Sequence, residues 1–260
     1  MSIRVAVAGA TGKLGSVAVR LIEQADDLEL VASLNSRSSL EEMLGANVLV
    51  DMTLPAVSPE VVAFAIDHGL KVLVGTSGWS ADRILDLERR VAEHEGSGAV
   101  VIPNFSLGSV LGTAFATVAA RFFDSIEIIE AHGEGKVDSP SGTAVRTAEL
   151  IGAARAQRGP VDAPHTDQRA RGQQVASVPI HSMRMRGVAA QQQVVFGGAG
   201  ETLTIRHDTV GSQSYEAGIL LALRAAATST GVIVGLDSLI DLGIAEPDGQ
   251  PPRPTVRENA

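Results

Sequence analysis

The chain has 260 residues, a formal net charge of −9 and no cysteine, and 45% of its residues are hydrophobic but only 3% aromatic. This composition supports a packed aliphatic core and excludes global disorder. The acidic balance argues against a general nucleic-acid-binding protein, and the lack of cysteine excludes disulfides and thiolate chemistry. We expect no signal peptide and no membrane span, because an apolar strand begins the chain and no apolar run reaches roughly 18 residues. We therefore expect a cytoplasmic protein.

Short apolar segments alternate with helical patterns over about residues 1–105. Strands are expected at 3–8, 28–34, 48–52, 71–74 and 99–102, and helices at 14–24, 59–68 and 81–95. Continuously apolar strands that alternate with helices favour a parallel sheet covered on both faces. The predicted fold class is therefore α/β, with a Rossmann-type doubly wound parallel sheet in this first part.

The pattern changes after residue 105. Helices are expected at 106–123, 143–156 and 217–227, strands at 126–132, 178–186, 189–196 and 202–207, a long loop at 158–174, and a last apolar stretch at 232–244. The last three strands are linked by short turns, which suggests an antiparallel sheet and a second domain of the α+β class. The tail at 245–260 is rich in proline and charge, and we expect it to be disordered.

Three glycines, Gly9, Gly12 and Gly15, follow the first strand and open the first helix. Glycines there permit a tight turn and a close approach to a phosphate, which the free N–H groups of the helix then bind. A plain turn is the alternative, but the position at the first strand–helix junction favours a dinucleotide site. The candidate cofactor-binding residues of this loop are Gly9, Thr11, Gly12, Lys13, Leu14 and Gly15.

The end of the second strand indicates which dinucleotide is bound. Asn35, Ser36 and Arg37 stand where an acidic residue would bind the ribose 2′-hydroxyl of NAD. Because Arg37 suits a 2′-phosphate instead, we expect NADPH to be preferred and NADH to be possible. A solvated loop charge is the alternative for Arg37. Other strand ends add the candidate cofactor contacts Thr53, Gly75, Thr76 and Ser77.

The most informative segment is 130–144, with the sequence EAHGEGKVDSPSGTA. A strand ends near His132, a polar loop carries Lys136, and Ser141, Gly142 and Thr143 open a helix. Free N–H groups at a helix start and a nearby lysine suit a carboxylate-bearing substrate. His132 can supply or position a proton near neutral pH. Each residue alone could be structural, so the combination carries the functional interpretation.

These motifs resemble those of the 4-hydroxy-tetrahydrodipicolinate reductases (dihydrodipicolinate reductases), whose signature runs roughly E-x-H-H-x-x-K-x-D-x-P-S-G-T-A. The similarity also covers the glycine loop, the turn at 75–78, the segment Pro103-Asn104-Phe105-Ser106 and the late strand at 200–207. It spans nearly the whole chain up to about residue 244. The resemblance implies the reduction of a cyclic imine dicarboxylate, or its hydroxylated precursor, with NADPH or NADH in lysine and diaminopimelate biosynthesis.

The resemblance also implies roles for residues and domains. His132 and Lys136 act in catalysis in that scheme. The substrate-binding positions are Gly133, Lys136, Ser141, Gly142 and Thr143, and further cofactor-binding positions are Pro103, Asn104 and Phe105. Residues 1–105 and 216–244 would form the dinucleotide-binding domain, and 106–215 a substrate-binding and oligomerisation domain that builds a homotetramer. We expect no metal site, because the six histidines are scattered.

The chain departs from the family signature beside His132. Gly133 replaces a substrate-binding histidine, Gly135 replaces another frequent histidine, and Glu134 adds a negative charge. Arg184 or His181 could supply a missing donor. Two alternatives therefore stay open: a paralogue that reduces a different imine or keto acid, and a non-catalytic NADPH-binding regulator.

Overall fold

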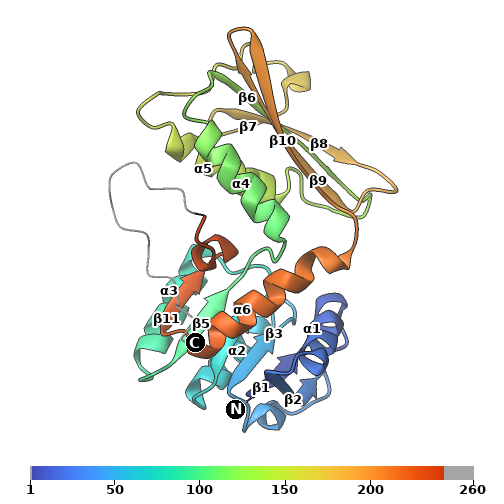
Figure 1. Cartoon of the computed structure of the whole chain (residues 1–260), viewed down its shortest axis with the longest axis vertical. Coiled ribbons are helices and arrows are strands. Elements are labelled where there is room, and N and C mark those ends of the chain that lie inside the picture. The colour runs from blue at the N-terminus through green and yellow to red at the C-terminus, as the bar shows by residue number, and fades with distance from the viewer. Residues whose placement is uncertain (1, 243–260) are drawn as a thin grey trace. The chain divides into compact units, whose positions relative to one another are not determined.

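A computed structural model describes residues 2–242 of the chain. These residues form two compact units, one made of the residues up to 106 together with those from 215 onward, and one made of residues 107–214 (Figure 1). The tail expected to be disordered, at 245–260, lies outside the described residues. No helix in the described range is long and apolar enough to cross a membrane.

The first unit is built around a six-stranded parallel sheet with the strand order β11-β5-β4-β3-β1-β2. Its strands are β1 (Ile3–Ala8), β2 (Leu28–Leu34), β3 (Val48–Asp51), β4 (Lys71–Val74), β5 (Gly98–Val101) and β11 (Gly231–Val234). Its helices are α1 (Lys13–Gln24), α2 (Ser58–Asp67), α3 (Ala81–Ala92) and α6 (Glu216–Thr228). Because α1 packs with α6 and α2 packs with α3, helices flank the sheet as a doubly wound fold requires.

The buried strands explain this architecture. Every residue of β3 and β5 is buried, as expected for strands that helices cover on both faces. The predicted Rossmann-type parallel sheet is confirmed. The apolar stretch at 232–244 was not resolved into elements by its sequence pattern, and the structure shows that it contains most of β11, which pairs with β5 at the edge of the sheet.

The second unit contains a five-stranded mixed sheet with the order β10-β9-β6-β8-β7. Its strands are β6 (Ser125–His132), β7 (Gln173–Val175), β8 (Val178–Arg184), β9 (Ala190–Gly198) and β10 (Glu201–Thr209). Helices α4 (Leu107–Ala119) and α5 (Gly142–Ala154) pack against each other and against this sheet. Their alanines join the isoleucines and valines of the strands, together with the buried ring of Phe196, in one hydrophobic core.

The expectation of a purely antiparallel second sheet is wrong. Strand β6 lies between β8 and β9, and it pairs parallel to β8 but antiparallel to β9. The short connection after β8 therefore crosses the end of β6 instead of forming a hairpin, and the backbone N–H of Met185 donates to the carbonyl of His132 at that crossing (3.0 Å). The loop expected at 158–174 also holds a short 3₁₀ helix (Arg169–Arg171) and the start of β7.

Candidate functional site

The first glycine of the loop is required by both conformation and space. Gly9 has φ of +76°, and a Cβ atom there would lie 2.4 Å from the carbonyl oxygen of Met52. A Cβ atom on Gly15 would lie 2.0 Å from the carbonyl oxygen of Gly9. A side chain at either position would therefore push the loop away from the sheet. The glycine pattern thus brings the backbone of the loop against the neighbouring strand end.

The start of α1 offers N–H groups to an anion. Gly12, the residue before the helix, provides no side-chain cap. The N–H groups of Lys13 and Leu14 have no hydrogen-bond partner within residues 2–242. Lys13 and Thr11 are exposed beside them. Unsatisfied N–H groups and the positive end of the helix dipole suit a pyrophosphate, so these residues fit a dinucleotide.

The other candidate cofactor loops meet at the same sheet edge. A Cβ atom on Gly75 would lie 2.5 Å from the sulfur of Met52 and 2.7 Å from the ring of Phe105. The loops after β1, β3, β4 and β5 are therefore in contact at the carboxyl ends of their strands. Thr76 is buried there, and Ser77 and Pro103 are exposed. This edge is where doubly wound sheets bind ligands.

A buried carboxylate organises this edge, although no sequence motif gives it a role. Asp51 is fully buried and accepts hydrogen bonds from the N–H of Thr53 (3.1 Å), the hydroxyl of Thr53 (2.5 Å) and the hydroxyl of Ser58. The indole of Trp79 donates to Ser58 (2.9 Å). Asp51 thus fixes the loop that carries Thr53, while its position at the end of a buried apolar strand was the only signal in the sequence.

The end of β2 presents an exposed cation. Asn35, Ser36 and Arg37 are all exposed, and the side-chain oxygen of Asn35 accepts from the N–H of Arg37 (2.9 Å). The guanidinium of Arg37 forms no ion pair in the described structure. The carboxyl end of β2 therefore carries a positive charge and no carboxylate among these three residues.

In the second unit, the strand pairing changes from an apolar row to a polar row. One row consists of Ile180, Ile128, Val194 and Ile205, and the next consists of Ser182, Glu130, Gln192 and His207. Directly paired residues share a face of the sheet, and the apolar row belongs to the core under α4 and α5. The polar row therefore lies on the helix-facing side, next to the end of β6.

Glu130 is the centre of that polar row, and it is fully buried. Burial alone would raise the pKa of its carboxyl group. The hydrogen bonds that it accepts from Arg184, Ser182 and His132 outweigh burial and hold the pKa below its ordinary value. Glu130 is therefore a buried carboxylate anion with charged and polar donors around it. Glu130 belongs to the sequence motif at 130–144, but its residue type and spacing alone do not indicate this role.

His132 and Lys136 lie on the two sides of a short turn. The Nδ1 atom of His132 lies 2.5 Å from Glu130 Oε2, and because a carboxylate can only accept, Nδ1 donates. The backbone N–H of Lys136 donates to the carbonyl of Gly133 (3.1 Å), which closes the turn. The ammonium of Lys136 lies 2.8 Å from Asp138 and is partly exposed, and this contact lowers the pKa of the Asp138 carboxyl.

The start of α5 leaves two N–H groups open. Ser141 caps the helix by accepting from the N–H of Ala144 (3.2 Å), and its own N–H donates to Glu130 (3.2 Å). The N–H groups of Gly142 and Thr143 have no partner among the residues that the structure describes. A Cβ atom on Gly142 would meet nothing within 4 Å, so the first turn is open to a ligand.

The positions that depart from the family signature are open or already paired. A Cβ atom on Gly135 would meet nothing within 4 Å, and one on Gly133 would meet only the carbonyl of Val188 at 3.3 Å. The carboxylate of Glu134 is paired with exposed Arg186 (2.9 Å). The negative charge of Glu134 is therefore balanced locally.

Neither proposed replacement donor is free to bind a ligand on the face of the sheet that carries Glu130. His181 pairs with Ile129 in the strand register, so it lies on the opposite face of the sheet from Glu130, and its Nε2 donates to the carboxylate of Glu127 (2.7 Å). Arg184 lies on the same face as Glu130, but its guanidinium donates to the carboxylate of Glu130 and to three backbone carbonyls.

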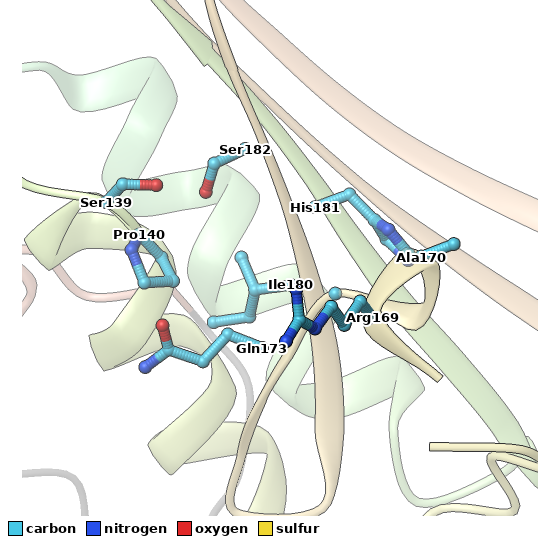
Figure 2. Close-up of a pocket in the computed structure, with 9 residues that line it drawn as sticks. Ser139, Pro140, Arg169, Ala170, Gln173, Ile180, His181 and Ser182 are labelled. Carbon is cyan, nitrogen blue, oxygen red and sulfur yellow. The ribbon is translucent and has the colours of Figure 1, made fainter. Parts of the chain in front are cut away.

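A cavity of about 450 Å³ adjoins the motif on the side of β8. Figure 2 shows Ser139 and Pro140 at one end and His181, Arg169 and Ala170 at the other. Ile180 and Ser182, two residues apart in β8, also line it. The loop between His132 and the start of α5 therefore has solvent on one flank.

A dinucleotide fold joined to a separate unit with a histidine, a lysine and an open helix start is the architecture of an oxidoreductase that uses a pyridine nucleotide. Comparisons with known proteins identify the family to which the chain belongs. Residues 3–105 match the N-terminal region of dihydrodipicolinate reductase, and residues 108–240 match its C-terminal region. The chain belongs to the dihydrodipicolinate reductase family, which confirms the resemblance seen in the motifs.

Individual relatives agree with this assignment. The chain is 64% identical over 242 residues to 4-hydroxy-tetrahydrodipicolinate reductase of Clavibacter sepedonicus, covering 93% of this chain and 87% of the relative. It is 46% identical to the Streptomyces griseus protein of the same name, covering 92% and 98%. A dipicolinate-bound dihydrodipicolinate reductase from Paenisporosarcina sp. TG-14 matches with TM-score 0.79 and 31% identity, covering 92% of this chain and all of that one.

Proposed function

We propose that this chain reduces 4-hydroxy-tetrahydrodipicolinate, or the cyclic imine formed from it by loss of water, to tetrahydrodipicolinate in lysine and diaminopimelate biosynthesis. One observation carries the proposal: His132, Lys136 and the open N–H groups of α5 surround one short loop in a member of the reductase family. The substrate is a dianion, and these groups are the cationic and N–H donors that two carboxylates need. The comparisons give no support to a different substrate or to a non-catalytic regulator.

The bound dinucleotide supplies a hydride, and one proton completes the reduction. Lys136 and the N–H groups of Gly142 and Thr143 hold the carboxylates and so orient the ring. His132, whose Nδ1 is committed to Glu130, presents Nε2 for proton transfer. Lys136 is the second candidate proton donor. Protonation of the imine nitrogen makes the ring more electrophilic, so binding and proton supply act on the same step.

The loss of the family histidine at Gly133 fits this function if the remaining donors suffice. Lys136, Gly142 and Thr143 still provide a charge and two N–H groups. The side-chain space at Gly133 is open except toward Val188, so a water molecule or substrate oxygen can occupy it. We therefore expect the same reaction, with a KM governed by these three donors.

We propose NADPH as the preferred cofactor and NADH as a possible one. Arg37 is an exposed cation at the end of β2, and a 2′-phosphate is a dianion at that position. The test compares kcat/KM for the two cofactors in the wild-type enzyme and in Arg37→Ala. We expect the variant to lose NADPH preference while its NADH kinetics stay unchanged. A wild-type enzyme that strongly prefers NADH would contradict this assignment.

We also propose a cytoplasmic homotetramer formed through the second unit. The face of its sheet opposite α4 and α5 carries Ile129, Val195 and Met183, and Met183 is 43% exposed. A second copy of the chain is the occupant that the family resemblance implies. Light scattering of the purified protein should give the mass of four chains, and a monomer at micromolar concentration would contradict the proposal.

The decisive assay couples enzymatic generation of 4-hydroxy-tetrahydrodipicolinate to oxidation of NADPH. We expect saturable turnover and competitive inhibition by dipicolinate against this substrate. A matched reaction with an open-chain keto acid tests the alternative that the chain is a paralogue acting on a different substrate. Tight NADPH binding without turnover of the cyclic substrate would contradict the proposed function.

A further inference from the structure

One buried carboxylate contacts both halves of the proposed substrate site. Glu130 Oε2 accepts from Nδ1 of His132 (2.5 Å), and Glu130 Oε1 accepts from the backbone N–H of Ser141 (3.2 Å). The first contact is to the proton-transferring histidine, and the second is to the residue that begins the carboxylate-binding helix. These residues are nine positions apart in the sequence, and the loop between them is largely exposed. Glu130, a buried residue, therefore connects His132 to the start of α5 by two direct hydrogen bonds.

Arg184, the ion-pair partner of Glu130, fixes the loop between His132 and Ser141. Arg184 donates to both oxygens of Glu130 (3.0 Å each). It also donates to the backbone carbonyls of Lys136 (3.3 Å), Asp138 (2.5 Å) and Met183 (2.7 Å). A guanidinium has five N–H donors, and all five are used by these contacts. Arg184 therefore has no donor left for a substrate, and two of its acceptors, the carbonyls of Lys136 and Asp138, lie on the loop that carries the proposed catalytic lysine.

From these contacts we propose that the Glu130–Arg184 ion pair is a positioning device for catalysis, which holds His132, Lys136 and the start of α5 in one arrangement. This inference rests on the proposed function, since it assigns those three elements to one substrate. Neither residue touches the substrate in this proposal. Glu130 acts through the ring of His132, and Arg184 acts through the backbone carbonyls of Lys136 and Asp138.

The charge of Glu130 also sets which ring nitrogen of His132 faces outward. A carboxylate only accepts, so it keeps the hydrogen on Nδ1 and leaves Nε2 for the reaction. Charged groups around it are Arg184 from β8 and Lys136 and Asp138 from the loop, and His207 lies in the same polar row on β10. A neutral amide at position 130 would present N–H donors to Arg184 or Ser141, where acceptors are needed.

The test must avoid an unpaired buried charge, because removing one partner of a buried ion pair costs about 3–5 kcal/mol and can prevent folding. The main variant is therefore the double substitution Glu130→Gln with Arg184→Gln, which removes both charges at similar size. The second variant is Arg184→Lys, which keeps the charge but offers three donors in place of five. The control is Asp124→Asn with Arg158→Gln, an exposed ion pair in the same unit whose arginine also donates to a backbone carbonyl.

Three readouts separate positioning from general destabilisation. They are kcat and KM as functions of pH, the affinity for dipicolinate, and the ¹⁵N chemical shifts of the His132 ring. We expect the double variant to lose kcat by at least tenfold, with an altered pH profile and with His132 no longer fixed as the Nδ1–H form. Arg184→Lys should mainly raise KM, and NADPH affinity should be unchanged in all variants.

Wild-type kinetics in the double variant, or a His132 ring signal identical to wild type, would overturn the inference. The ring signal and dipicolinate binding do not depend on which substrate is reduced. If wild-type enzyme fails to turn over the cyclic substrate, the proposed function fails while these two measurements still decide the role of Glu130. Loss of NADPH binding in the double variant but not in the control would show a general folding defect and contradict a positioning role.

Discussion

At the scale of single residues, the charge on Lys136 is already balanced in the protein. Its ammonium lies 2.8 Å from the carboxylate of Asp138, and both side chains are partly exposed. A dianionic substrate would compete with Asp138 for this cation. Surface ion pairs are weak, so exchanging the carboxylate of Asp138 for one of the substrate costs little.

Substitution of Lys136 tests its role directly. Lys136→Ala removes a carboxylate contact and a candidate proton donor, so we expect kcat/KM to fall by about 10²-fold or more. Arg89→Ala, which removes an exposed cation from α3, is the control and should leave the rate unchanged. Steady-state kinetics with NADPH measure both variants. Unaltered kinetics in Lys136→Ala would remove the lysine from the mechanism.

The depressed pKa of Glu130 predicts how stability depends on pH. A carboxyl group whose pKa is lower in the folded state stabilises that state above its unfolded pKa, and this contribution is lost as pH falls through the folded pKa. The free energy of unfolding of wild type should therefore exceed that of Glu130→Gln at neutral pH. The difference should shrink below about pH 4.5, because protonated Glu130 resembles the amide.

Urea unfolding from pH 7 to pH 3 measures that difference. Glu149→Gln, a substitution of an exposed glutamate on α5, serves as the control and should show only a small difference across the range. A difference between wild type and Glu130→Gln that stays constant with pH would contradict a charged Glu130.

At the scale of elements, the starts of α1 and α5 supply most of the N–H donors that the proposed binding sites need. Ser141 caps α5 and Ser80 caps α3 in the same way, each accepting from an N–H three residues later (3.2 and 3.5 Å). Only the first of these helices carries open N–H groups beside the loop that holds Lys136. The two caps therefore form a matched pair for experiments.

Alanine at either cap should reduce stability by about 1 kcal/mol. Only Ser141→Ala should also weaken dipicolinate binding, by about fivefold, because it loosens the first turn around Gly142 and Thr143. Thermal unfolding and isothermal titration give the two quantities. Equal dipicolinate affinity in Ser141→Ala and Ser80→Ala would contradict carboxylate binding at α5.

The glycine loop gives a second element-scale prediction. Gly9→Ala adds a Cβ atom 2.4 Å from the carbonyl of Met52, whereas Gly69→Ala adds one to open space at nearly the same φ (+76° and +78°). Both variants incur backbone strain, but only the first displaces the loop. We expect Gly9→Ala alone to lose the rise in melting temperature that NADPH causes. Equal NADPH stabilisation in both variants would contradict the loop as the cofactor site.

Local patterns predicted most elements, because β1, β2 and β4 are short apolar runs bounded by turns. They did not predict the order of β8, β6 and β9, because strand neighbours depend on contacts between distant segments. The same limit applies to the site. The residue types and spacing of the motif indicated His132 and Lys136, whereas the role of Glu130 depends on its pairing with β8, which the sequence does not reveal.

At the scale of the whole molecule, each unit is proposed to bind one reactant. The first unit fits a dinucleotide through the Gly9 loop and the start of α1, and the second fits a dicarboxylate through Lys136 and the start of α5. A reductase of this kind must bring both reactants together during turnover.

Hydride transfer itself is the most direct test of this account. The reaction is run with enzymatically generated 4-hydroxy-tetrahydrodipicolinate and with NADPH deuterated at the transferable position of the nicotinamide, and the product is analysed by mass spectrometry. We expect one deuterium in each tetrahydrodipicolinate formed, with one NADPH consumed. We also expect the rate to fall by about 10²-fold in Lys136→Ala. Oxidation of NADPH without deuterium in the cyclic product, or no oxidation at all, would contradict it.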